Sequence, residues 1–72
     1  MAVMGTDAAD GSRVILYRLP DQLDGSPDLL LLAGRDAANC TSEGFGSVAK
    51  AVRAFHSAVR RHGGPRRGAA RP

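Results

Sequence analysis

The segment from Ser47 to Pro65 constrains the fold most, because it has the features of a complete amphipathic helix. Ser47 suits the N-cap, since its hydroxyl can accept a hydrogen bond from an unpaired amide of the first turn. Apolar side chains then recur at helical spacing, at Val48, Ala51, Val52, Phe55, Ala58 and Val59. Gly63 and Gly64 before Pro65 end the pattern, because glycine adopts the left-handed cap and proline cannot continue a helix. The pattern predicts a helix over residues 48–62.

Upstream of this helix, short apolar runs are typical of β-strands. Residues 13–18 are rich in β-branched and aromatic side chains, and residues 28–33 form a short apolar run flanked by turn residues. Residues 37–41 fit a weaker third strand. Strands joined by short loops pair antiparallel most simply. We therefore expect an α+β fold, with a three-stranded antiparallel sheet followed by one amphipathic helix packed on one face.

The expected domain is small. Residues 13–62 form the predicted βββα unit, residues 1–12 are expected to be disordered, and residues 63–72 form a basic disordered tail. A unit of about fifty residues lies near the lower limit for a stable lone domain, and small scaffolds often complete their core by oligomerising. The single Cys excludes an intrachain disulfide. No segment has the roughly 18 apolar residues that span a membrane, and residues 1–12 do not look like a signal peptide, so we expect a cytoplasmic protein.

A short motif before the helix carries a family resemblance. From Leu31 to about Ser57 the chain resembles the YegP-like family of small, uncharacterised bacterial proteins. The matching motif positions are Ser42, Glu43, Gly44, Phe45 and Ser47, followed by Ala49, Ala51 and Ser57 in the helix. The resemblance implies a single sheet with a helix on one face, built from two tandem repeats or from two one-repeat subunits. This chain has one repeat, so the resemblance implies a homodimer.

The alternation of side chains along the two firmest strands predicts a second apolar surface. Successive residues of a strand point to opposite faces, so Val14, Leu16, Leu29 and Leu31 can all receive the helix. Another apolar set then points away from the helix: Ile15, Tyr17, Leu30 and Leu32. An uncovered apolar face usually marks an interface, which here predicts contact with a second copy of the chain or with an unidentified protein. Coverage by loops or tails, and a groove for a small ligand, are the alternatives.

The charges are unevenly distributed along the chain. Residues 1–45 contain all 7 acidic residues, whereas residues 46–72 contain seven of the 10 basic residues and no acid. Basic side chains of this kind can contact nucleic-acid phosphates. The candidates are Lys50, Arg53, Arg60, Arg61, Arg66 and Arg67. Because the tail has no aromatic residue to stack on bases, we expect such binding to be weak and non-specific, and a merely solvated tail is the alternative.

Residues for catalysis are few. Cys40 could act as a nucleophile with His56 or His62 as base, but no spacing supports this pairing, and a lone Cys in a strand is usually a small buried hydrophobe. Glu43 has no obvious carboxylate partner. The sequence predicts no enzyme, no metal site and no cofactor. It favours a small interaction module that acts as a homodimer, with a basic nucleic-acid-binding accessory protein as the alternative.

Overall fold

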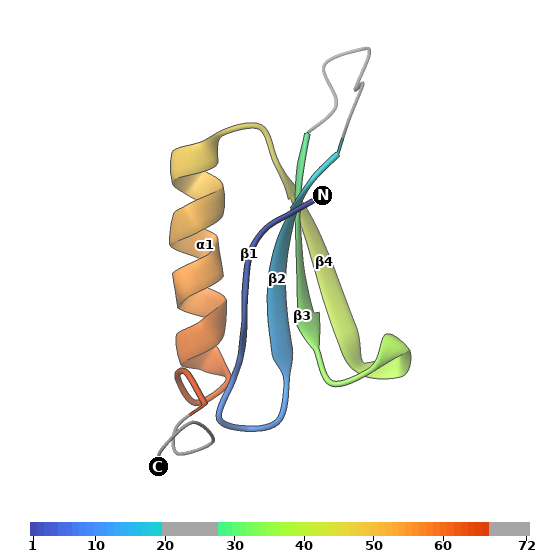
Figure 1. The fold of residues 1–72 in the computed structure, drawn as a ribbon, viewed down its shortest axis with the longest axis vertical. Coiled ribbons are helices and arrows are strands. Elements are labelled where there is room, and N and C mark those ends of the chain that lie inside the picture. The colour runs from blue at the N-terminus through green and yellow to red at the C-terminus, as the bar shows by residue number, and fades with distance from the viewer. Residues whose placement is uncertain (20–27, 67–72) are drawn as a thin grey trace.

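A four-stranded antiparallel sheet with one helix on it makes up the fold (Figure 1). The computed structural model describes residues 1–19 and 28–66. The strands lie side by side in sequence order, and each pairs with the next. They are β1 (Ala2–Asp7), β2 (Arg13–Arg18), β3 (Leu29–Gly34) and β4 (Cys40–Phe45), followed by the helix α1 (Val48–Arg61). The expected α+β class is confirmed, but the sheet has four strands and not three.

The additional strand is β1, so the expectation that residues 1–12 are disordered is wrong. β1 pairs with β2 from Ala2↔Tyr17 to Asp7↔Arg13, with an irregularity between Ala2 and Met4. A turn centred on Gly11, whose φ is 93°, connects the two strands. The β1 sequence contains glycine and an acid and has little β propensity of its own. Pairing with the strongly β-forming neighbour β2 supplies the stabilisation that β1 lacks alone.

The last strand is also displaced from its expected position. Residues Ala37–Asn39 form a 3-10 helix, because the side chain of Asp36 accepts hydrogen bonds from the backbone N–H groups of Ala38 and Asn39 at 3.0 Å. The predicted third strand at residues 37–41 is therefore wrong in its first half. β4 extends instead to Phe45, so most of the family motif lies in an edge strand.

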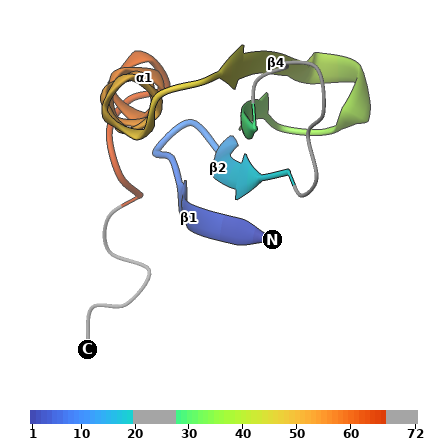
Figure 2. The ribbon, with the colours of Figure 1, turned by 90° about the horizontal axis from the view of Figure 1, so that it is seen from above.

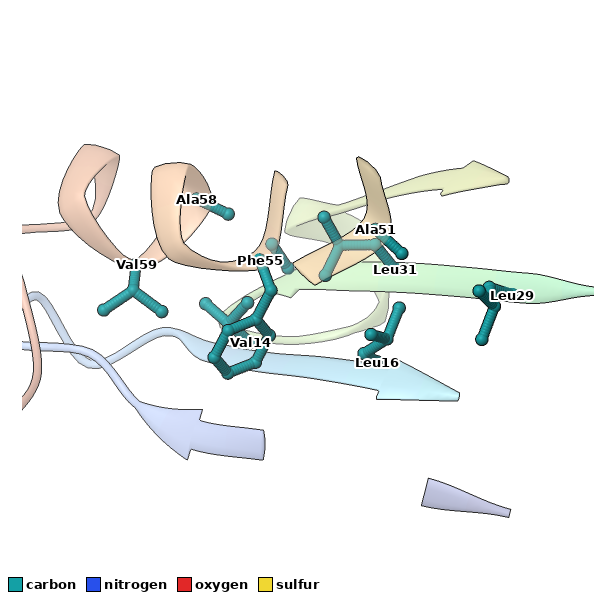
Figure 3. Close-up of a cluster of buried hydrophobic side chains, with 9 residues drawn as sticks. Val14, Leu16, Leu29, Leu31, Ala51, Phe55, Ala58 and Val59 are labelled. Carbon is teal, nitrogen blue, oxygen red and sulfur yellow. The ribbon is translucent and has the colours of Figure 1, made fainter. Parts of the chain in front are cut away.

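The core lies between α1 and one face of the sheet, where the helix contacts β2, β3 and β4 (Figure 2). The buried cluster contains Val14, Leu16, Leu29, Leu31, Ala33, Ala51, Phe55, Ala58 and Val59 (Figure 3). Four of its strand residues are those that alternation assigned to the helix side, and Ala33 continues the same alternation in β3. Most of the expected helix stripe is confirmed, since Ala51, Phe55, Ala58 and Val59 are buried and Val52 packs against the cluster, but Val48 in the first turn is 54% exposed.

Both ends of α1 agree with the sequence prediction. The Ser47 hydroxyl accepts a hydrogen bond from the N–H of Lys50, and Gly63 takes up the left-handed conformation after the helix, with φ 97°. The chain then turns back toward the free edge of β1. Arg66 N–H donates to the Asp7 carbonyl, and Ala9 N–H donates to the Gly64 carbonyl, each at 2.8 Å. Residues 63–66 are therefore ordered by β1 and are not part of a disordered tail.

A polar clamp joins the β1–β2 turn to the end of α1. One carboxylate oxygen of Asp10 lies 2.8 Å from His62 Nδ1, and the other accepts a hydrogen bond from Ser12 N–H at 2.8 Å. The backbone N–H of Asp10 also donates to the His62 carbonyl. The hydrogen bonds from His62 and Ser12 lower the pKa of the Asp10 carboxyl from 3.8 to about 2. The clamp holds together two segments that are far apart in the sequence.

The Asp10 carboxylate makes the stability of the fold depend on pH in the acidic range. Its pKa is lower in the folded chain, so its contribution is fully present above pH 3.8 and is lost as the pH falls towards 2. We expect the thermal midpoint to fall more steeply over this range for the parent chain than for Asp10→Asn. The variant is the control, because it keeps the other carboxyls and loses only this titration. If the thermal midpoints of the two proteins fall equally steeply over this pH range, Asp10 is not the group responsible.

Candidate interaction surfaces

The sheet face turned away from α1 carries the four apolar residues that alternation placed there. Ile15 and Leu32 are direct cross-strand partners, as are Tyr17 and Leu30. The four side chains therefore form one compact patch on β2 and β3, which we call the open-face patch. Each is partly exposed, whereas the strand residues of the helix side are buried. The two faces thus differ in burial although both are apolar.

The strands on either side of the open-face patch present small side chains to the same face. On β1, Gly5 pairs with Ile15. On β4, Gly44 pairs with Leu30 and Ser42 pairs with Leu32. At these positions the side chains of the central strands therefore project further from the sheet than those of the neighbouring strands. This shape leaves the patch accessible to a second surface laid against the sheet.

A second surface is a groove of about 290 Å³ between α1 and the edge strand β4. Its lining combines cationic, polar and apolar groups: Leu31, Glu43, Lys50, Arg53, Ala54, Ser57 and Arg61. Glu43 stands on the helix side of β4, because its pairing partner is the buried Leu31. Lys50, Arg53, Ser57 and Arg61 follow one another at intervals of three, four and four residues along α1. Such intervals place side chains in a row on one side of a helix.

The groove divides the basic residues that the sequence had grouped together. Lys50, Arg53 and Arg61 line the groove. Arg60 contacts the Ser57 hydroxyl from outside the lining, and Arg66 lies beside β1 at the opposite edge of the sheet. Arg67 lies outside the described residues. The nucleic-acid candidates therefore do not form one continuous surface in the described part of the chain.

The groove cations have no acidic partner among residues 1–19 and 28–66. The ion pairs there are Arg13–Asp7, Arg18–Asp28 and His62–Asp10, all of them away from the groove. Glu43 lines the same groove but makes no ion pair with Lys50, Arg53 or Arg61. The groove thus holds three cations and one carboxylate, none of them in an ion pair within the described part of the chain.

The proposed Cys–His pair is not supported by the arrangement of the elements. Cys40 shares its face of β4 with Ser42 and Gly44, which is the open face, whereas His56 is on α1 across the sheet. His62 is engaged with Asp10. Cys40 is also exposed, so its expected role as a small buried hydrophobe is wrong. In the part of the chain that the structure describes, no three potential metal ligands lie together.

The family-motif residues have structural positions that the motif alone did not specify. Ser42, Glu43 and Gly44 pair with β3, half-buried Phe45 packs against the core cluster, and Ser47 caps α1. Ser57 is a groove residue that sequence reasoning did not single out as functional; its spacing from Arg53 and Arg61 was the available indication.

No family model, curated protein or solved structure matched the chain. Within the described residues, no helix combines the length and hydropathy needed to cross a membrane.

Proposed function

We propose that this chain is a non-enzymatic interaction module that acts as a homodimer, with the open-face patch as its subunit interface. The observation that carries the proposal is the apolar patch on the sheet face that α1 leaves uncovered. An apolar surface of this kind is stabilised when a second surface removes it from water. Two sheets can pack face to face with their side chains interdigitated.

The small size of the core supports a second copy as the occupant of the patch. The buried apolar residues of the described chain include four alanines, at positions 8, 33, 51 and 58. The larger buried residues are Val14, Leu16, Leu29, Leu31, Phe55 and Val59. A core of this size supplies little stabilisation, and small domains often add to it by association. Two copies would bury both patches in one shared layer.

The resemblance to YegP-like proteins points to the same assembly. Those proteins build their sheet from two repeats or two subunits, and this chain has one repeat. A twofold arrangement is the simplest closed assembly, and it brings the same patch from each subunit together. We propose that the chain is a single-repeat relative of that family and that dimerisation replaces the second repeat.

Charged substitutions in the patch provide the test. Ile15→Glu combined with Leu30→Lys should convert the dimer to monomer, because both charged side chains would have to leave water to be buried against the partner. Sedimentation velocity or light scattering of parent and variant at equal micromolar concentrations reports the change. The buried helix-side residues are untouched, so circular dichroism should still show the folded chain.

A matched control uses the exposed first turn of α1. Val48→Lys with Ala49→Glu introduces the same pair of charges at exposed positions outside the open face, and should leave the dimer intact. A parent that stays monomeric at high micromolar concentration would refute the proposal. A dimer that survives the Ile15 and Leu30 substitutions would place the interface elsewhere, with the free edge of β4 as the next surface to test.

A further inference from the structure

We propose that the groove between α1 and β4 binds a single strand of nucleic acid, with its phosphates along Lys50, Arg53 and Arg61. The inference is separate from the dimer proposal, because the groove lies on the helix side of the sheet and the open-face patch lies on the other. It also differs from binding through a basic tail, since Arg60 and Arg66 are outside the groove lining. Either proposal can therefore fail without the other.

The length of the cationic row favours a polymer over a single small phosphate. Lys50 and Arg61 are eleven residues apart on α1, which corresponds to about 16 Å along the helix axis. One phosphate group can contact only neighbouring members of such a row. A phosphodiester chain laid along the groove can contact all three cations, and each contact releases counterions from the nucleic acid.

The other lining residues favour a single strand over a duplex. Half-buried Ala54 adds apolar surface to the lining above the buried Leu31, and Glu43 adds a carboxylate from the β4 side. In a duplex only the base edges reach the grooves, because the base faces are stacked inside and cannot cover this apolar surface. In a single strand the bases are free to turn, so their faces can cover the apolar surface and their edges can approach Glu43.

Glu43 gives the groove a preference among bases. A carboxylate accepts a hydrogen bond from an exocyclic amino group, such as that of cytosine, whereas thymine has no amino group to offer. The Glu43 carboxylate would repel a phosphate placed next to it, which keeps the backbone on the α1 side. The groove lining contains no aromatic residue for stacking, so the phosphate contacts carry most of the affinity.

Fluorescence anisotropy with labelled oligonucleotides tests the proposal. The probes are twelve-nucleotide oligo-dC and oligo-dT, a duplex of equal length, and a mononucleotide competitor. For the parent chain, three phosphate contacts predict a slope of about −2 in a plot of log affinity against log salt. The groove variant Lys50→Gln, Arg53→Gln, Arg61→Gln should lose roughly tenfold or more in affinity and most of this salt dependence.

The matched control removes the same number of charges outside the groove. Arg13→Gln, Arg35→Gln, Arg66→Gln should keep the affinity for oligo-dC within about threefold of the parent value. All six substituted side chains are exposed, so both variants should fold, which circular dichroism checks. Equal losses in the two variants would show only a general effect of positive charge and would overturn the proposal, as would no binding by the parent at low salt.

The remaining probes separate the possible sources of phosphate. Tighter binding of the duplex, or displacement of the oligonucleotide by a stoichiometric amount of mononucleotide, would overturn the assignment to a single strand. Glu43→Ala should remove the preference for oligo-dC over oligo-dT without weakening the binding of oligo-dT. A parent chain that binds the two equally would refute the role given to Glu43.

Discussion

Replacing Phe55 with alanine should lower the free energy of unfolding by about 3–5 kcal/mol. Phe55 is 4% exposed and is the largest side chain in the core cluster. It points from α1 toward the sheet, within the buried cluster (Figure 3). Its truncation removes apolar contacts and leaves a cavity that the backbone of a four-stranded sheet cannot easily fill. Urea unfolding of parent and variant at one protein concentration measures the loss, since dimerisation would couple stability to concentration.

Val48→Ala is the matched control for this prediction. The sequence pattern places Val48 on the same stripe as Phe55, but the structure leaves it 54% exposed. Its truncation should change the free energy of unfolding by no more than about 0.5 kcal/mol. A Phe55→Ala chain as stable as the parent would contradict the packing of α1, and a large loss from Val48→Ala would favour the stripe expected from sequence.

Gly34→Ala should destabilise the fold by about 3 kcal/mol or more, because a methyl group at this position would collide with backbone. A Cβ on Gly34 would lie 2.5 Å from Cys40 Cα and closer still to the carbonyl oxygen of Asn39. These atoms belong to the 3-10 turn and to the start of β4, which pairs with Gly34. Neither can move without opening the β3–β4 pairing. Denaturant unfolding measures the loss, and amide exchange should show it concentrated in β4.

Gly46→Ala makes the same chemical change where there is room for it. Nothing lies within 4 Å of a Cβ at Gly46, and its φ is outside the left-handed region. This substitution should be close to neutral, within about 0.5 kcal/mol. If both glycine variants unfold at the same denaturant concentration, the close approach of β3 to the 3-10 turn is wrong.

The sequence determined the helix and the two central strands because their patterns are local and strong. Ser47 and Gly63 lie directly beside the two ends of the helix, and the apolar residues between them repeat with a single helical period. The alternation in β2 and β3 likewise assigned each apolar side chain to a face before any partner was known. Both faces of the central strands, and hence the open-face patch, could be read in this way.

Only the tertiary structure decided the outer strands and the groove. β1 and β4 have weak strand patterns, and they become strands because the edges of β2 and β3 offer unpaired backbone groups to them. The groove brings Glu43 of β4 and Arg53 of α1 into one lining, which depends on how the helix sits over the sheet. Hydrophobic periodicity specifies which side of an element is buried, whereas the pairing of edges and the angle of packing depend on contacts between segments distant in the chain.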